Sequence, residues 1–422
     1  MASDIEAGVQ AQARAARQAS RAMALATRAE KDAALLAMAE GLTRRQAEIL
    51  AANQRDLGAG AAAGLSKVLL ERLTLSPARV AAMAQGLREV AALPDPCGQV
   101  LAEVSRPNGI KVQKLRVPLG VIAMVYESRP NVTVDAAGLC LKAGNAVVLR
   151  GGKEAIESNK ALGAVIREAL QATLKAGDAV QLIETTDRAA VAALLHCDRD
   201  IDVVIPRGGP GLISMVRRES RIPVISHGIG NCHVYLDASA DLKMAEDIAF
   251  NAKTQRPGVC NAMEHLLVAK AAAPALVPAL AARLRAAGVS LRGDKQAAAL
   301  AGMDQVLAED DPQWDEEYLD LICGIKVVEG LEQAIAHINR HGSGHSDAIV
   351  TRDAAAGERF LREVDSAAVY VNASTRFTDG SEFGLGAEIG ISTQKLHARG
   401  PMGLEELCST KFVVRGDGQV RV

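Results

Sequence analysis

Hydrophobic positions along the chain change their spacing near residue 100, and this change predicts two kinds of structure. Up to residue 93, apolar side chains recur at helical spacing over 5–40, 44–59 and 66–92, which predicts a series of helices. Pro94 and Pro96 end this series. Further along, short apolar runs alternate with longer helical patterns. Such alternation predicts strand–helix–strand units and therefore parallel sheets with right-handed crossovers.

The predicted strands fall into two series and one separate group. The first series is predicted at residues 120–125, 146–150, 180–183, 203–205 and 224–225. The second begins near residue 233 and has strands at 265–269, 325–328, 347–350 and 368–371. The separate group consists of strands at 101–104 and 110–117 and a terminal hairpin of 411–414 and 419–422. We expect this group to pair with itself and to offer its edges to another subunit.

Composition and charge exclude several classes of protein. The 422 residues include 48 basic and 50 acidic side chains, a balance that argues against a nucleic-acid partner or a polybasic membrane surface. Apolar stretches such as 117–126 are far shorter than the roughly 20 residues that a spanning helix needs. The seven cysteines are scattered without a C-x-x-C pattern, which predicts free thiols and a reducing compartment, the cytoplasm.

Cys260 is the strongest candidate for chemistry. It lies in a Pro-Gly loop between a predicted helix and the strand that contains His265. Lys253 and Arg256 are close in sequence and would lower the pKa of the thiol. A helix beginning at Asn261 would add its N-terminal dipole. The alternative is a half-buried structural cysteine, which is the usual fate of a free cysteine. Cys232 and His233 are adjacent, but neighbouring side chains of an extended segment point to opposite faces.

Two kinds of loop follow predicted strands of the first series. Asn131 opens a helix after the strand at 120–125, where it is either a helix cap or an amide donor to a developing oxyanion. Arg150-Gly151-Gly152-Lys153 and Pro206-Arg207-Gly208-Gly209 are glycine turns at the ends of later strands. Glycines there allow a ligand to approach the backbone, and Arg150 and Lys153 suit an anion such as an adenosine 2'-phosphate. Together the turns favour a nucleotide site at this sheet edge over simple tight turns.

Two other patterns are weaker. Residues 384–390 resemble a dinucleotide fingerprint with one extra residue, but they follow no clear strand and open no clear helix. His337, His341 and His345 have the spacing of a metal-binding helix face, yet Gly342 and Gly344 interrupt that helix. We therefore expect no metal site.

Five segments together resemble a known family: residues 117–159, 201–213, 251–268, 337–351 and 383–407. They are similar to the gamma-glutamyl phosphate reductase (glutamate-5-semialdehyde dehydrogenase) family of the aldehyde dehydrogenase superfamily. The resemblance runs from the N-terminal helices to the last strand. It implies an α/β, aldehyde-dehydrogenase-like fold with two parallel-sheet domains and a small β oligomerisation element. It also implies an oxidoreductase that reduces L-glutamyl 5-phosphate with NADPH, releasing phosphate, in proline biosynthesis.

The resemblance also implies roles for individual residues. Cys260 matches the nucleophile that carries a thioester, and Asn131 matches the side-chain amide of the oxyanion hole. The cofactor would contact Arg150, Gly151, Gly152 and Lys153 at its adenosine ribose, Pro206, Arg207, Gly208 and Gly209 at its pyrophosphate, and Glu317 at its nicotinamide ribose. Lys253 and Arg256 are candidates for the anionic ends of the substrate.

One departure from the superfamily separates the possible reactions. Hydrolytic aldehyde dehydrogenases carry a glutamate that activates water, whereas the equivalent stretch here, residues 226–233, contains none. Because a thioester must survive until it is reduced, this absence favours phosphate exchange over hydrolysis. His227 and His233 remain possible bases. The alternatives are a hydrolytic NAD(P)+ aldehyde dehydrogenase and a catalytically silent scaffold.

The expected domains follow from the same resemblance. Residues 1–99 and 118–232 form the NADP-binding domain, with 365–399 returning to it. Residues 233–364 form the catalytic domain, and 100–117 with 400–422 form the oligomerisation element. The expected partners are the small-molecule substrate, other copies of the chain and, through functional coupling, a glutamate 5-kinase.

Overall fold

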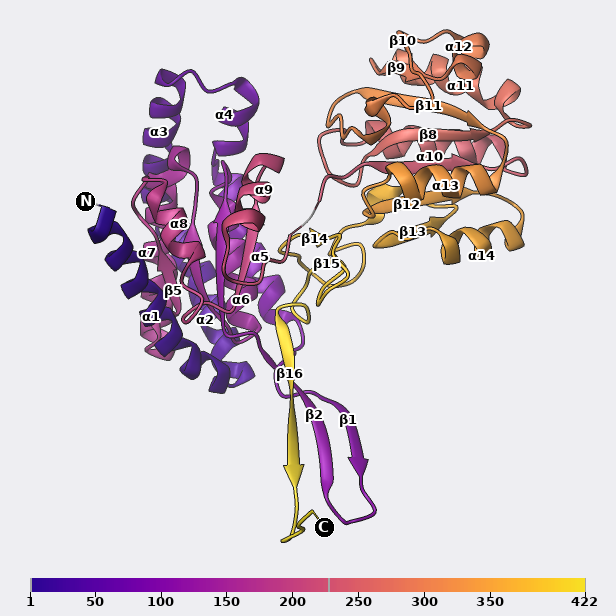
Figure 1. Ribbon diagram of the computed structural model, residues 1–422. Coiled ribbons are helices and arrows are strands. Elements are labelled where there is room, and N and C mark those ends of the chain that lie inside the picture. The colour runs from indigo at the N-terminus through magenta and orange to yellow at the C-terminus, as the bar shows by residue number, and fades with distance from the viewer. Residues whose placement is uncertain (1, 227, 422) are drawn as a thin grey trace. The chain divides into compact units, whose positions relative to one another are not determined.

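The computed structural model describes residues 2–226 and 228–421 (Figure 1). The chain divides into two compact units, and each is described by itself. Unit 1 comprises Met1–Ser226, Gly384–Gly390 and Met402–Val422. Unit 2 comprises His227–Phe383 and Ile391–Pro401. Among the described helices, none is long and apolar enough to cross a membrane.

The N-terminal part of unit 1 is helical, as its apolar spacing predicts, but the chain breaks into more helices than expected. These are α1 (Ala2–Leu25), α2 (Arg28–Arg44), α3 (Gln46–Ala62), α4 (Lys67–Leu73) and α5 (Pro77–Ala92). The single helix expected over residues 5–40 is wrong. Thr27 caps α2 by accepting from the backbone N–H of Glu30, while the Glu30 side chain accepts from the backbone of Thr27. This reciprocal cap starts a new helix inside an otherwise uniform pattern.

Unit 1 contains a four-stranded parallel sheet in the order β5-β4-β3-β6. Its strands are β3 (Val121–Tyr126), β4 (Ala146–Arg150), β5 (Val180–Leu182) and β6 (Val203–Arg207), and its helices are α6 (Asn131–Lys142), α7 (Ile156–Leu174), α8 (Ala189–Leu195) and α9 (Pro210–Glu219). Short 3-10 turns η1 (Lys153–Ala155) and η2 (Gly177–Ala179) precede α7 and β5. Every residue of β3 and β4 is buried, as expected for parallel strands covered on both faces. The strand expected at 224–225 is reduced to one bridge between Val204 and Val224.

A three-stranded antiparallel sheet also belongs to unit 1. Its order is β1-β2-β16, from β1 (Val100–Ser105), β2 (Lys111–Pro118) and β16 (Cys408–Arg415). Figure 1 shows β16 alongside β2, which confirms the pairing predicted between these distant segments. The terminal hairpin expected at 411–414 and 419–422 is not formed by the described residues. β16 pairs with β2, and residues 419–421 form no strand.

Unit 2 contains a seven-stranded parallel sheet in the order β10-β9-β11-β8-β7-β12-β13. The strands are β7 (Cys232–Leu236), β8 (Met263–Ala269), β9 (Ser290–Gly293), β10 (Gln305–Val306), β11 (Ile322–Val328), β12 (Ser346–Val350) and β13 (Ala368–Val371). One apolar core packs the sheet against α10 (Leu242–Thr254), α11 (Ala273–Ala286) and α12 (Lys295–Ala301). A second core packs it against α13 (Leu331–His341) and α14 (Ala354–Glu363). The unit is completed by η3 (Pro312–Asp315), η4 (Thr375–Phe377), β14 (Ile391–Ser392) and β15 (Gly400–Pro401).

The extent of the units differs from the expected domain boundaries. Residues 365–399 were expected to return to the first domain, but β13 pairs in parallel with β12 of the second sheet. Of that range, only Gly384–Gly390 belongs to unit 1. The physical reason is that β12 would otherwise present an unpaired edge, which β13 satisfies with backbone hydrogen bonds.

Candidate active site

The Cys260 loop connects α10 to β8, as the sequence predicts. Cys260 is half-buried, whereas Cys140, Cys232 and Cys323 are fully buried. Burial raises the pKa of the Cys323 thiol to about 12 and raises the pKa of Cys232 well above its usual value. A half-buried thiol on a loop is therefore the better placed nucleophile among these cysteines.

The expected helix beginning at Asn261 is wrong. Residues 255–262 form turns, and β8 begins directly afterwards at Met263. Asn261 instead donates its side-chain amide to the carbonyl oxygen of Thr378, at 2.8 Å. No helix dipole therefore acts on Cys260 from this residue.

The segment before β7 lies directly against the Cys260 backbone. Because β7 and β8 are parallel neighbours, with Cys232 opposite Met263, the loops that lead into them meet at one edge of the sheet. The Cys232 thiol donates to the carbonyl oxygen of Cys260 at 3.2 Å. A Cβ atom on Gly230 would lie only 2.0 Å from that oxygen. Because Gly230 has no side chain, the Cys260 backbone can occupy this space.

Lys253 and Glu264 form a fully buried ion pair across the base of this loop. Lys253 Nζ lies 2.7 Å from Glu264 Oε2, and both side chains are 0% exposed. Burial raises the pKa of Glu264 to about 7, and the charge of Lys253 opposes the increase. The contact that the structure records for Lys253 is thus internal, and its role as a substrate ligand stays a prediction. Arg256, by contrast, is exposed.

His233 points away from the Cys260 loop, as the alternation along a strand predicts. Its backbone N–H and its Nδ1 lie 2.7 Å and 3.2 Å from Asp347 Oδ1. The ring is fully buried and packs with those of His265 and His337, at centroid distances of 5.3 Å and 5.5 Å. His233 therefore belongs to a buried cluster of histidine rings. His227 lies outside the described residues.

We expect this histidine cluster to make unit 2 sensitive to acid. Burial, and then the charge of His233, lowers the pKa of both His265 and His337 below the usual 6.5. Each stays neutral in the folded state but takes up a proton when unfolded, so stability falls as pH drops below about 6.5. Each residue would contribute a slope of about 1.4 kcal/mol per pH unit. Urea unfolding at pH 7, 6 and 5 would show a shallower slope for His337→Gln. The exposed control His196→Gln should keep the wild-type slope, and equal slopes for all three proteins would contradict the expectation.

In unit 1, the loops after β3, β4 and β6 meet at the carboxyl edge of the sheet. The register places Val125 opposite both Arg150 and Pro206, which confirms that the two glycine turns belong to one sheet and shows that they flank the same strand. Lys153 is exposed at this edge. This is the edge at which parallel α/β sheets bind ligands.

The side chain of Arg150 is turned inward at that edge. Its terminal nitrogens donate to the carbonyl oxygens of Gly151, at 2.6 Å, and Thr186, at 3.2 Å. Burial lowers the pKa of its guanidinium. Arg150 therefore ties together the loops that follow β4 and β5, and its contact with a cofactor phosphate stays a prediction.

The glycines of both turns are explained in part by the protein's own side chains. A Cβ on Gly151 would lie 2.2 Å from Asn159 Nδ2, and one on Gly152 would lie 2.1 Å from Glu154 Oε1. A Cβ on Gly208 would lie 2.5 Å from Glu127 Oε2, which also accepts from the backbone N–H of Gly209. The absence of a side chain at these glycines makes room for neighbouring side chains of the protein, whether or not a ligand also approaches them.

Asn131 is the first residue of α6 and does not cap it. Pro130 occupies the cap position, and Asn131 Nδ2 donates to Asp135 Oδ2 at 2.8 Å. Nearby, Ser128 adopts a positive φ of 46° and is held by Glu154 Oε1, which accepts from both its N–H and its hydroxyl. Backbone strain of this kind gathers at functional sites. Its local sequence, between Glu127 and Arg129, gave no pattern that would have singled out Ser128.

Glu317 lies in unit 2, on the segment that leads towards β11. Burial raises its pKa, and a hydrogen bond from the backbone N–H of Gly230 opposes the increase. Its carboxylate therefore lies beside the Gly230 segment that contacts Cys260. Its contact with the nicotinamide ribose stays a prediction.

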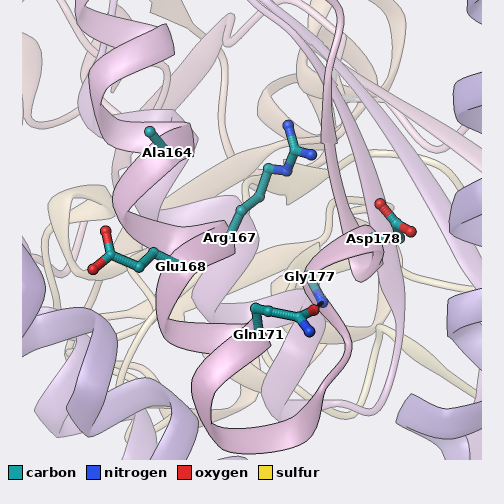
Figure 2. A pocket seen from close by; sticks show the side chains of 6 residues that line it. All are labelled: Ala164, Arg167, Glu168, Gln171, Gly177 and Asp178. Atoms are coloured by element: carbon teal, nitrogen blue, oxygen red, sulfur yellow. Dashed lines mark hydrogen bonds between the residues drawn. The ribbon is translucent and has the colours of Figure 1, made fainter.

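A surface hollow of about 390 Å³ lies elsewhere in unit 1, beside the end of α7 (Figure 2). It is lined by Ala164, Arg167, Glu168, Gln171, Gly177 and Asp178. Figure 2 shows Gln171 reaching towards Gly177, whose N–H donates to Gln171 Oε1 at 3.3 Å, while Glu168 points away. None of the predicted site residues lines this hollow, so we assign it no role in the chemistry.

Comparison with known proteins defines the class first. The model of the aldehyde dehydrogenase family matches residues 2–305 and 303–413. An acetylating aldehyde dehydrogenase from Geobacillus thermoglucosidasius has the same fold, with a TM-score of 0.69 at 18% identity over 100% of this chain and 99% of that one. The chain belongs to the aldehyde dehydrogenase family and is an oxidoreductase, which confirms the predicted fold class. Such enzymes act on small molecules with nicotinamide cofactors.

Closer relatives share one particular name. Gamma-glutamyl phosphate reductase from Moorella thermoacetica is 57% identical over 413 residues, 98% of each chain. Its namesake from Syntrophomonas wolfei subsp. wolfei is 52% identical over 421 residues, 100% of each chain. The crystal structure of gamma-glutamyl phosphate reductase from Thermotoga maritima has a TM-score of 0.96 and 46% identity, covering 98% of this chain and 100% of that one. The resemblance inferred from the motifs is confirmed.

Proposed function

We propose that the protein reduces L-glutamyl 5-phosphate to L-glutamate 5-semialdehyde, with NADPH as reductant and release of phosphate, as a step of proline biosynthesis. The observation that carries this proposal is the identity of 52% to 57%, over essentially the full length, to relatives named gamma-glutamyl phosphate reductase. Conservation of length and fold supports the same reaction rather than a distant one.

Cys260 is the proposed nucleophile. Its sulfur forms a bond to the acyl carbon, the bond from that carbon to the phosphate oxygen breaks, and a thioester remains. Asn131 is the proposed amide donor to the oxyanion of this step. NADPH would supply a hydride when bound. Addition of this hydride to the thioester carbon and cleavage of the carbon–sulfur bond would leave the aldehyde and the Cys260 thiolate.

The residues proposed to hold the cofactor are those at the carboxyl edge of the unit 1 sheet, together with Glu317. The exposed Lys153 suits the charge of an adenosine 2'-phosphate, and this fit favours NADPH over NADH. Arg150 and the glycine turns Gly151–Gly152 and Pro206–Gly209 would shape the surrounding loop. Lys253 and Arg256 are the proposed contacts for the substrate's anionic ends, of which Arg256 is exposed.

The β1-β2-β16 sheet is the proposed oligomerisation element. Val100, Leu101 and Val104 of β1 and Phe412 and Val414 of β16 are exposed apolar side chains on strands at the two edges of this sheet. Another copy of the chain would cover them. None of the seven cysteines forms a disulfide, which supports a reducing compartment such as the cytoplasm. Functional coupling to a glutamate 5-kinase would shorten the lifetime of the labile acyl phosphate in solution.

The proposed function is tested by phosphate dependence in the reverse direction. Glutamate 5-semialdehyde and NADP+ should yield NADPH beyond a single turnover only when phosphate or arsenate is added, because phosphate must take the acyl group from Cys260 before the next turnover. The same assay with NAD+ measures cofactor preference. Equal turnover without phosphate would instead identify a hydrolytic aldehyde dehydrogenase, and no turnover under any condition would favour a silent scaffold.

A further inference from the structure

A positive side chain that the sequence patterns did not single out lies beside the Cys260 loop. Arg376 is the middle residue of η4 (Thr375–Phe377), which follows the last strand of the unit 2 sheet. Nothing in its local sequence resembles a binding motif. Arg376 lies close to the Cys260 loop only because the chain after β13 comes back to the amino end of β8.

Hydrogen bonds fasten the η4 turn to both arms of the Cys260 loop. On the far side of the cysteine, Thr375 Oγ1 donates to the carbonyl oxygen of Asn261 at 2.7 Å. Asn261 Nδ2 in turn donates to the carbonyl oxygens of Thr378, at 2.8 Å, and Arg376, at 3.4 Å. On the near side, Arg376 Nε donates to Gln255 Oε1 at 2.9 Å. Arg376 is thereby held at a fixed place relative to the sulfur.

The guanidinium of Arg376 is poised for an anion. Its Nη1 and Nη2 atoms have no hydrogen-bond partner in the part of the chain that the structure describes, since only Nε is engaged. Burial lowers the pKa of Arg376, and the positive charge of Arg256 lowers it further, whereas negative charge on Cys260 and on Asp379 opposes the decrease. Arg376 therefore lies within electrostatic reach of Arg256 and Cys260. Two neighbouring guanidinium groups repel each other, and an anion that contacts both of them offsets this electrostatic repulsion.

We propose that Arg376, together with Arg256, binds the phosphate group of the acyl phosphate beside Cys260 and holds it as it leaves. This inference rests on the proposed function. The phosphate is joined directly to the carbon that the sulfur attacks, whereas the α-carboxylate lies at the other end of the substrate. A group fixed beside the sulfur therefore meets the phosphate. The planar fork of arginine also matches the geometry of phosphate oxygens.

The assignment explains how the leaving group departs without a general acid. As the carbon–sulfur bond forms, the bond between carbon and the bridging oxygen breaks, and its electron pair stays on the phosphate. The negative charge on phosphate therefore increases during this step. Two guanidinium groups facing it stabilise that increase, and no proton is needed from the protein.

The inference is tested by measuring the KM values of phosphate and semialdehyde separately, in the reverse reaction of the full-length protein with NADP+. Arg376→Gln should raise the KM for phosphate about tenfold or more, the effect of losing a charge-assisted hydrogen bond. The KM for semialdehyde, which carries no phosphate, should change less than about twofold. Arg376→Lys keeps the charge but loses the fork and should lie between. The matched control Arg362→Gln, on the exposed face of α14, should behave as wild type.

Three outcomes decide the matter. A phosphate KM within twofold of wild type in both Arg376 variants would overturn the inference, and so would a rise confined to the semialdehyde KM, which would assign Arg376 to the carboxylate. If Arg376→Gln does not fold, inorganic phosphate should still slow the alkylation of Cys260 by iodoacetamide in the wild type, and absence of protection would contradict the proposal. Wild-type turnover that needs no phosphate would reject the proposed function itself, which is a separate failure.

Discussion

Cys260→Ala is expected to abolish the phosphate-dependent oxidation of glutamate 5-semialdehyde, with a loss of at least about 10⁴-fold in kcat. The reason is that, among the described thiols, only Cys260 is both half-buried and part of the loop between α10 and β8. Cys232, whose sulfur contacts the same loop, is fully buried, and its raised pKa keeps it protonated. The folded state should persist, because Cys260 is only half-buried and its removal leaves no large cavity.

The matched control for this variant is Cys97→Ala. Cys97 is also half-buried and outside any disulfide, but it lies in unit 1, where its thiol donates to the carbonyl oxygen of Ala143 at 3.1 Å. It should retain turnover close to wild type. Iodoacetamide should label Cys260 faster than Cys97. Equal labelling rates together with an active Cys260→Ala protein would show that Cys260 is not the nucleophile.

Gly230→Ala is expected to lower kcat about 100-fold while leaving most of the protein's stability in place. The added Cβ would lie 2.0 Å from the carbonyl oxygen of Cys260 and 2.6 Å from its Cα, so the backbone of the cysteine must move. Because both neighbours are backbone atoms, no side-chain rotation relieves the clash. A displacement of about 1 Å of a reacting group is enough to cost a factor of this size.

Gly258→Ala is the matched control, since Gly258 lies in the Cys260 loop itself. Its Cβ would meet only the carbonyl oxygen of Leu319, at 3.6 Å, which is an ordinary contact. Comparing the kcat values of both variants should therefore separate the effect of displacing Cys260 from the effect of a general change in loop flexibility. Equal losses in the two variants, or an unchanged kcat in Gly230→Ala, would contradict the proposed role of Gly230.

The repeating part of the fold could be predicted from the sequence, because it follows from local spacing. Buried runs such as 121–126 alternate with helices in both units, and the glycine turns after β4 and β6 were correctly placed at the ends of strands of one sheet. What failed was decided by single side chains. Thr27 interrupts a continuous helical pattern because it caps a new helix. No helix forms at Asn261, whose side-chain amide donates to the carbonyl oxygen of the distant Thr378.

Only those residues of the candidate site that lie in recognisable sequence motifs could be predicted. Cys260 and its loop were found because the Pro-Gly segment stands out between a helix and a strand. Arg376 was missed because its proximity depends on pairing between β12 and β13, which is a tertiary contact. Lys253 was expected to face the substrate. Only the structure shows that its ammonium group forms a buried ion pair with Glu264.

The most direct test of the account is to identify the residue that carries the acyl group. The wild-type protein, incubated with glutamate 5-semialdehyde and NADP+ but without phosphate, should accumulate a glutamyl adduct, which peptide mass spectrometry should place on Cys260. Addition of phosphate should discharge it. An adduct on any other residue, or none while NADPH is being formed, would contradict the account.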